Sequence, residues 1–254
     1  MIGHMKTRNL NPLISCFGFM VWFLFSAVFI ACEDEKEADP EIQTGTMTDI
    51  DGNVYKTVYI NGKWWMAENL NVKTYRDGTP IQNLVDDNDW NSAQDGYAVH
   101  PGASSTEMGL LYNWAAVSNP AGLAPSGWHI ATDDEWKQLE ASLGMESSAV
   151  NKTGWRGSTE GDALKQTGIT NWYRNDPVWA TNSSGFSALA GSCRLYNGQF
   201  GDPGVRYTGF WWTSTTSNND TSKAWYRYLD YKSSAVFRQY VSKQYGLSVR
   251  CVKD

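Results

Sequence analysis

Short apolar and β-branched runs alternate with turn residues from residue 44 to the end of the chain. The clearest pair of runs, Val54–Ile60 and residues 63–67, flanks the dipeptide Asn61-Gly62. Both residues of that dipeptide tolerate positive φ angles, so the pattern predicts a β-hairpin with a type I′ turn. Similar turn signals recur downstream, which indicates a domain made mostly of strands and loops.

The C-terminal quarter has the period of two that is typical of strands. Residues 225–230 alternate, so we expect alternate side chains on opposite faces of one strand. The residues expected on one face are Tyr226, Tyr228 and Asp230. Residues 235–241 can form the returning strand, and residues 246–253 a last strand with Cys251 on its apolar face. We therefore predict an antiparallel meander at the end of the chain.

Helical patterns are fewer. Residues 132–143 begin with Thr132 as N-cap and Glu135 three residues later, which is a capping box. The apolar stripe of this helix has one polar member, Glu140, so we expect the helix to pack on a sheet. The other helix candidates are residues 109–117 and, more weakly, residues 162–166.

No linker-like run or internal repeat interrupts residues 44–254, so we predict a single domain there. The elements together predict an α+β fold with a small twisted antiparallel sheet, about two main helices and long irregular loops.

The N-terminal segment has the pattern of a targeting signal. Lys6 and Arg8 precede an uncharged apolar stretch at residues 13–31. This stretch is long enough to cross a bilayer, and it also fits the apolar region of a signal peptide. Two interpretations follow, a cleaved signal at residues 1–31 or a signal anchor that stays as one transmembrane helix.

The end of this stretch favours cleavage. Ala31 leads directly into Cys32, and the arrangement resembles the lipobox of bacterial lipoproteins, although Phe29 stands where Leu is usual. The resemblance implies that Cys32 is lipidated, becomes the mature N-terminus and holds the protein on a membrane.

Charge narrows the choice of partners. The chain has 21 basic and 27 acidic residues and a net charge of -6, which argues against nucleic-acid binding. Acidic residues are concentrated directly after Cys32, so we predict a solvated tether over residues 32–43. This acidic run also resembles the surface-export signal of Bacteroidetes lipoproteins, and a plain spacer is the alternative.

Several ordered motifs resemble one known family. They are DIDGNVY at 49–55, WWMAENL at 64–70, GLLYNW at 109–114, GWHIAT at 127–132, GFSAL at 185–189, WWTST at 211–215 and YGLSVRCV at 245–252. Together they resemble the Fibrobacter succinogenes major paralogous domain over residues 44–254. The order of motifs is also distantly similar to the formylglycine-generating-enzyme and C-type-lectin-like fold. The family resemblance implies a lipoprotein or secreted protein and no particular biochemical activity.

Few residues offer catalytic chemistry. The chain has three His and four Cys, and no pair of Cys has the C-x-x-C spacing. His129 lies inside a predicted strand, where we expect a structural hydrogen bond instead of general-base catalysis. No acidic pair or nucleophile motif stands out. We therefore expect no catalytic residues, and an enzyme acting on an extracellular substrate is the alternative.

Two interpretations of the remaining cysteines are possible. With Cys16 removed and Cys32 lipidated, Cys193 and Cys251 remain. Cys251 can be a small buried apolar residue of the last strand. Alternatively, Cys193 and Cys251 form a disulfide outside the cytoplasm, which would close a loop of roughly 60 residues.

Calcium is a further question, because residues 86–89 and 218–220 offer oxygen ligands. Neither segment fits an EF-hand loop, and the Glu-Pro-Asn motif of classical C-type lectins is absent. We favour polar surface loops and expect neither a cofactor nor a metal site, with calcium as the alternative.

Tryptophan is unusually abundant, with 13 residues beside 13 Tyr. Exposed Trp and Tyr rings stack on sugars and provide large contact areas. Most of these rings lie in predicted strands and helices and are expected in the core. Four lie in polar or Gly-rich segments and are the candidate ligand contacts: Trp90, Trp155, Trp172 and Trp179.

These features predict a binding module that is anchored to a membrane by lipid on the outer membrane or surface of a Gram-negative bacterium. The expected partners are polysaccharides or surface glycoproteins. A structural component of the cell envelope is a third hypothesis, beside the enzyme.

Overall fold

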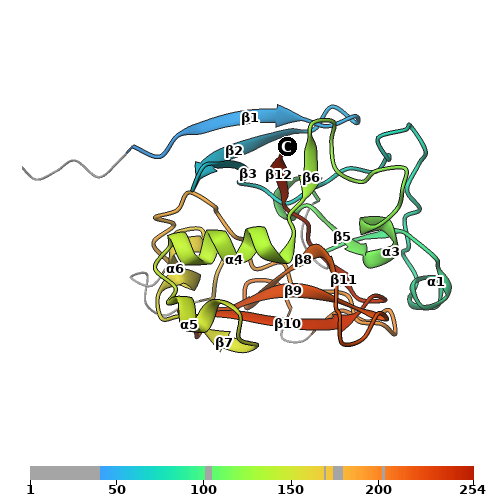
Figure 1. Ribbon diagram of the computed structural model, residues 1–254. Helices are drawn as coiled ribbons and strands as arrows, with labels where there is room; N and C mark the ends of the chain where they lie inside the picture. The colour runs from blue at the N-terminus through green and yellow to red at the C-terminus, as the bar shows by residue number, and fades with distance from the viewer. Residues whose placement is uncertain (1–40, 101–104, 169, 174–179, 202–203) are drawn as a thin grey trace, which may run out of the picture. The chain divides into compact units, whose positions relative to one another are not determined.

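Three antiparallel sheets, with short helices and long loops between them, form most of the structure (Figure 1). The computed structural model describes residues 41–100, 105–168, 170–173, 180–201 and 204–254, which belong to one compact unit, Pro40–Asp254. The architecture is α+β, as expected, with more sheet than predicted. No helix within these described ranges is long and apolar enough to cross a membrane.

The predicted hairpin belongs to a five-stranded sheet with the order β1-β2-β3-β12-β6. Its strands are β1 (Thr44–Thr48), β2 (Val54–Ile60), β3 (Lys63–Met66), β12 (Cys251–Lys253) and β6 (Trp128–Ile130). Asn61 and Gly62 connect β2 to β3 with φ angles of 48° and 80°. The predicted turn with two positive φ angles is therefore confirmed.

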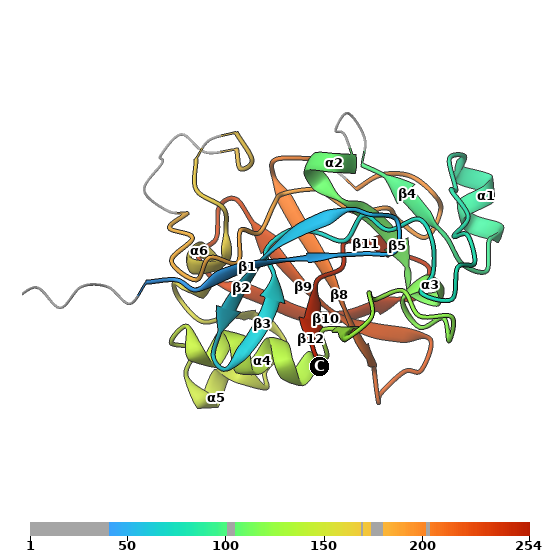
Figure 2. The ribbon, with the colours of Figure 1, turned by 90° about the horizontal axis from the view of Figure 1, so that it is seen from above.

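A four-stranded sheet with the order β7-β10-β9-β8 lies on the other side of the domain. Its strands are β7 (Gly154–Arg156), β10 (Val236–Ser242), β9 (Lys223–Asp230) and β8 (Thr208–Thr216). Strands β9 and β10 form the first two strands of the predicted meander, but their outer neighbours are β8 and β7 instead of the C-terminal strand. Seen from above, β1 and β2 cross over β8 and β9 (Figure 2).

The prediction of one continuous strand over residues 246–253 is wrong. Gly246 and Leu247 form β11 in a third sheet with β5 (Leu110–Asn113) and β4 (Tyr97–Val99), whereas Cys251 begins β12 in the five-stranded sheet. The fully buried Arg250 lies between them. Its guanidinium donates to the carbonyl oxygens of Met66, Phe186 and Ser187, so the chain changes sheet at this point.

Helix α4 (Asp133–Ser142) has the predicted capping box. Thr132 Oγ1 accepts from the Glu135 amide, and Glu135 Oε2 accepts from the Thr132 amide. The helix predicted at 109–117 is wrong, because strand β5 occupies its first half. Only α3 (Trp114–Val117) is helical, and the Asn113 side chain caps it. The other short helices are α1 (Asp87–Ser92), α2 (Ser105–Met108), α5 (Ser147–Val150) and α6 (Glu160–Leu164).

Two apolar cores lie on opposite faces of the strands. Neighbouring residues of one strand therefore enter different cores, because successive side chains point to opposite faces. The pairs divided in this way are Trp65 and Met66, Trp211 and Trp212, and Val252 and Cys251. Strands buried on both faces explain why the WW motifs are uninterrupted apolar runs.

A buried ionic network joins α4 to the four-stranded sheet. Glu140 pairs with Arg156 and Arg227 at 2.8 and 2.5 Å. Asp133 pairs with Arg227 and Arg238 at 2.7 and 2.6 Å. Burial raises the pKa of Asp133, but hydrogen bonds and attraction from the two guanidinium groups lower it to about 2. Glu140, the polar member of the predicted stripe, thus faces the sheet with its charge compensated.

Candidate functional site

Four aromatic side chains form a row across the four-stranded sheet, one from each strand. Trp155 of β7 pairs with Phe237 of β10, Phe237 pairs with Tyr228 of β9, and Tyr228 pairs with Phe210 of β8. The successive ring centroids are 5.2, 5.7 and 4.6 Å apart. We call these four residues the aromatic row.

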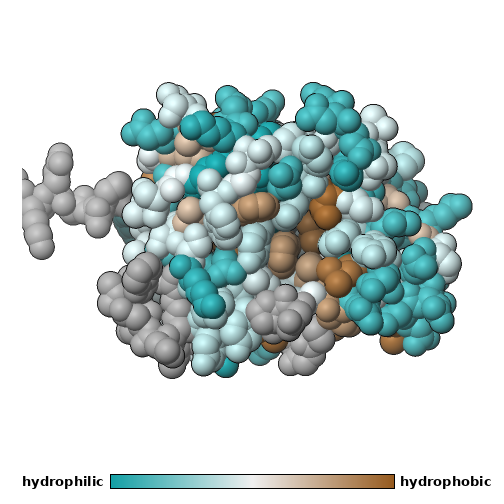
Figure 3. Space-filling model, turned by 90° about the horizontal axis from the view of Figure 1, so that it is seen from below, coloured by the Kyte–Doolittle hydropathy of each residue, from teal (hydrophilic) through white to brown (hydrophobic). Residues whose placement is uncertain are grey.

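The alternation of side chains along each strand explains why the row points outward. Arg227, Leu229 and Val236 point to the opposite face, where they are buried beneath α4 and the second core. The row itself remains partly open to solvent, and Trp155 has 46% of its surface exposed. Seen from below, hydrophobic side chains gather along the middle of the face on which β9 and β10 lie, between hydrophilic margins (Figure 3).

Ring orientation makes Trp155 the main contact surface of the row. Tyr228 and Phe210 stack with an interplanar angle of 14°, so each covers a face of the other. Phe237 meets Trp155 and Tyr228 edge to face, at 68° and 77°. Trp155 lies at the end of the row on β7, an edge strand of the sheet. Its indole therefore offers the largest free aromatic area, while Phe237 and Tyr228 pack against it.

Polar groups lie next to the rings. The Tyr228 hydroxyl donates to Asp230 Oδ2 at 2.5 Å, and the Lys232 amide donates to Oδ1 of the same carboxylate at 2.8 Å. Burial and the neighbouring carboxylate raise the pKa of Tyr228, so its hydroxyl stays protonated at neutral pH. Asp230 is half-buried and has lone pairs left to accept hydrogen bonds from a ligand. The arrangement combines an open aromatic surface with one carboxylate, and it can bind a ligand.

The described part of the chain contains no group of three or more His, Cys, Asp or Glu side chains placed to hold a metal ion. In the first calcium candidate, Asp87 pairs with Arg194 at 3.2 Å. In the second, Asp220 pairs with Lys223 at 3.0 Å and accepts from Ser222. These carboxylates thus have protein partners.

Residues 58–253 match the Fibrobacter succinogenes major domain. The chain belongs to this family. The match covers the four-stranded sheet, α4 and all four residues of the aromatic row, and it covers the five-stranded sheet except β1 and the first half of β2. Neither a curated protein nor a solved structure matches the chain significantly.

In this Fibrobacter succinogenes major domain, motif residues hold the fold together. Asn69 of the WWMAENL motif accepts from the Trp211 indole at 2.9 Å and from Arg250 at 2.7 Å. Arg250 in turn donates to the GFSAL motif through the carbonyl oxygens of Phe186 and Ser187. The motifs that identify the family therefore meet in the interior, and they do not form the open aromatic row.

Of the four candidate tryptophans, Trp155 is exposed, on a strand instead of in a loop. The prediction is wrong for Trp90 and Trp172, which are 2% and 0% exposed. Trp90 donates to the Gln244 carbonyl and packs against Arg194, while Trp172 donates to the Ala188 carbonyl. Both indoles thus lie in the interior beneath the polar segments that suggested exposure. Trp179 lies outside the described residues, as does Cys32.

Phe210 and Phe237 are not among the site residues predicted from the sequence, and Tyr228 is predicted only to lie on one face of its strand. The alternation over residues 225–230 did separate Tyr228 from the buried Leu229, as the structure confirms. No local signal could show that β7, more than 60 residues earlier in the chain, is the neighbour of β10. The row therefore depends on strand order.

Cys193 and Cys251 are both buried free thiols that contribute to the same core. The disulfide alternative is therefore wrong. Burial raises the pKa of the Cys193 thiol to about 12 and that of Cys251 further, so both remain protonated. They behave as small apolar side chains.

Neither described histidine contacts the aromatic row. His129 Nε2 lies 2.9 Å from Glu135 Oε1, and its Nδ1 lies 2.6 Å from Asp254 Oδ1. His100 is 2% exposed and bonds the Gly191 carbonyl through Nδ1. Burial lowers the pKa of His100 to about 4, so the ring is neutral at physiological pH. Both have structural contacts, as expected for His129.

Proposed function

We propose that this protein is an extracytoplasmic binding module that contacts glycans through the aromatic row. The observation that carries the proposal is Trp155, an exposed indole on an edge strand, which packs against the rings of Phe237 and Tyr228. A fixed aromatic surface binds at low entropic cost, because few rotatable bonds are immobilised on binding.

The polar neighbours fit the same ligand class. A sugar ring has apolar C–H faces and a rim of hydroxyl groups. Trp155 supplies a surface for the C–H face, and Asp230 supplies acceptors for hydroxyl groups near the row. A glycan chain would lie across the strands, parallel to the row.

The proposal includes the location of the protein. Cys32 would carry the lipid after removal of residues 1–31, and residues 32–43 would hold the domain away from the outer membrane of a Gram-negative cell. The distant likeness to the formylglycine-generating-enzyme and C-type-lectin-like fold is part of this proposal. Replacement of Cys32 by Ser is expected to abolish incorporation of labelled fatty acid in the native host. Continued labelling would contradict lipidation at this residue.

The test is direct binding. The full-length chain, purified in a mild detergent, would be applied to arrays of bacterial, plant and host polysaccharides and glycoproteins. We expect binding to a subset of neutral glycans and a loss of at least about tenfold in affinity for Trp155→Ala, as removal of a central aromatic contact causes. Tyr59→Ala removes a ring with 41% exposure from the other sheet and is the matched control.

Two results would contradict the proposal. If no glycan binds, the row is not a glycan site. If Tyr59→Ala and Trp155→Ala weaken binding equally, the row is not the contact surface. Binding of a surface protein in place of any glycan, lost in Trp155→Ala, would assign the row to a protein partner.

An enzyme is the second candidate, and one observation favours it. Glu68 and Glu107 line the same cavity of about 250 Å³ between β2 and the segment before β5. Most glycoside hydrolases use a pair of carboxyl groups, one as general acid and one as base or nucleophile. Turnover of a bound glycan, abolished by Glu68→Gln with binding unchanged, would establish this alternative.

A further inference from the structure

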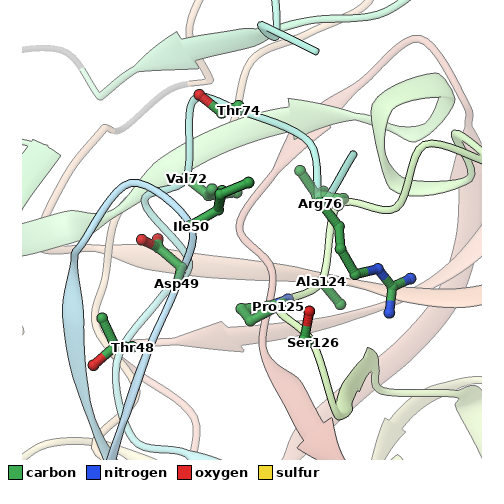
Figure 4. A pocket seen from close by; sticks show the side chains of 10 residues that line it. Thr48, Asp49, Ile50, Val72, Thr74, Arg76, Ala124, Pro125 and Ser126 are labelled. Atoms are coloured by element: carbon green, nitrogen blue, oxygen red, sulfur yellow. The ribbon is translucent and has the colours of Figure 1, made fainter. Parts of the chain in front are cut away.

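A cavity beside the five-stranded sheet provides a second candidate binding site, separate from the aromatic row. It has a volume of about 230 Å³ and lies where the β1–β2 turn, the segment around residues 72–76 and the loop at 123–126 meet. Asp49 and Arg76 lie on opposite sides of it (Figure 4). The size suits one sugar unit or a group of similar size.

Arg76 is the charged side chain of the cavity that remains available. It is exposed, and none of the described residues forms an ion pair with it. By contrast, four other arginines are buried and paired with carboxylates: Arg156, Arg194, Arg227 and Arg238. An unpaired guanidinium at a cavity is notable in a chain with a net charge of -6.

The Arg76 guanidinium lies against Gly122. The Arg76 amide donates to the Gly122 carbonyl at 2.8 Å. A Cβ atom at Gly122 would lie 2.6 Å from Arg76 Nη2, so the arginine side chain rests directly on this glycine. The φ angle of +85° at Gly122 also favours glycine. The local backbone therefore places Arg76 at the cavity, and glycine at 122 leaves room for its side chain.

Asp49 forms no ion pair with Arg76, and its oxygens accept hydrogen bonds within the β1–β2 turn. Oδ1 accepts from the Asp51 and Asn53 amides, and Oδ2 accepts from the Asn53 side chain and the Tyr55 hydroxyl. These bonds shape the β1–β2 turn. They also fix the wall of the cavity that faces Arg76.

The rest of the lining combines hydroxyl and apolar groups. The hydroxyl groups of Thr48, Thr74 and Ser126 have no hydrogen-bond partner in the described structure, and each can both donate and accept. Val72 and Leu123 supply an apolar surface. An anionic ligand with several hydroxyl groups and an apolar face would match the guanidinium, the hydroxyl groups and the apolar surface of the cavity.

We propose that this cavity binds a carboxylate-bearing sugar, a uronic acid unit of an acidic polysaccharide. Arg76 holds the carboxylate through paired N–H donors, and hydroxyl groups of the lining bind hydroxyl groups of the ring. The inference goes beyond the glycan site on the aromatic row, since it concerns another surface and another class of sugar.

The test is calorimetric titration of the full-length chain in detergent with trigalacturonic acid and with neutral galactotriose. The acid is expected to bind saturably, at least about tenfold more tightly than the neutral sugar, and more weakly as salt is raised. Arg76→Gln is expected to weaken binding of the acid at least about tenfold. Lys73→Gln removes a positive charge from the same exposed segment without altering the cavity lining, and it should bind as the wild type does.

Equal binding by wild type and Arg76→Gln would overturn the proposal, as would equal losses in Arg76→Gln and Lys73→Gln. Tighter, Arg76-dependent binding of a peptide with a free C-terminal carboxylate would assign the cavity to a protein ligand and overturn the sugar class. Trp155→Ala separates the two sites. If Trp155→Ala loses trigalacturonate binding, the acid binds on the aromatic row and the cavity proposal is overturned. If the row binds no glycan, Trp155→Ala should still bind trigalacturonate as the wild type does.

Discussion

The two faces of the four-stranded sheet are made by alternate residues of the same strands, yet they differ in almost every physical property. The inner face contains Arg227 and Arg238, buried and fully paired with acids of α4. The outer face contains the aromatic row, half-open and without an ion pair. One set of side chains fixes the helix on the sheet, and the other is partly exposed, with Phe210 also packing against the first core. Stability and binding can therefore be altered separately.

The largest expected effect comes from the inner face. Glu140→Gln removes the carboxylate that compensates Arg156 and Arg227, leaving buried positive charge without its partner. We expect a loss of about 3–5 kcal/mol in the free energy of unfolding, measured by urea denaturation. Asp134→Asn, at a side chain that is 77% exposed, is the control and should change it by less than about 0.5 kcal/mol. Equal effects would contradict the network's role.

Neighbouring residues of β9 test the comparison within one strand. Leu229→Ala should cost about 2–5 kcal/mol, because Leu229 is 1% exposed in the second core. Tyr228→Ala should cost about 1 kcal/mol, mainly through lost ring contacts with Phe210 and Phe237. Chemical denaturation of both variants measures the difference, and a larger loss for Tyr228→Ala would reverse our assignment of the faces.

Acid should lower the free energy of unfolding by weakening the ion pairs of Asp133 with Arg227 and Arg238. The pKa of Asp133 is about 2 in the folded protein and near 3.8 when unfolded, so the unfolded chain binds more protons between these values. Its contribution, about 2 kcal/mol, is present above pH 3.8 and is lost as pH falls towards 2. The free energy of unfolding should therefore fall more steeply with acid in the wild type than in Asp133→Asn. Identical pH slopes would exclude this contribution.

The smallest expected change in stability belongs to Trp155→Ala. Because nearly half of this side chain is already exposed, its removal should cost no more than about 1 kcal/mol. The melting temperature should shift by only a few degrees, while binding to glycans is lost. A cooperative collapse of the fold in this variant would show that the row is a core element.

Local patterns in the sequence predicted those parts of the structure that depend on neighbouring residues. Asn61-Gly62 predicted the turn, and Thr132 with Glu135 predicted the start of α4. The helix predicted over residues 109–117 was wrong, because a short apolar run is compatible with both a strand and a helix. Pairing of β5 with β4 and β11 favours the strand in the folded protein.

Burial of individual tryptophans was less predictable. Trp90, Trp172 and Trp155 all lie in polar or Gly-rich segments, yet only Trp155 is exposed. Trp90 is buried because Arg194, about 100 residues later, packs against its ring and the Gln244 carbonyl accepts its N–H. No pattern around residue 90 contains that information.

By itself, the sequence determined the family, the hairpin, the capped helix and the alternation that separates Tyr228 from Leu229. These follow from backbone preferences and side-chain direction over a few residues. Only the tertiary structure decided the order β7-β10-β9-β8, the division of the WW pairs between two cores and the placing of Arg76 on Gly122. Each of these depends on contacts between distant segments, whose free energy is gained only when the whole chain has folded.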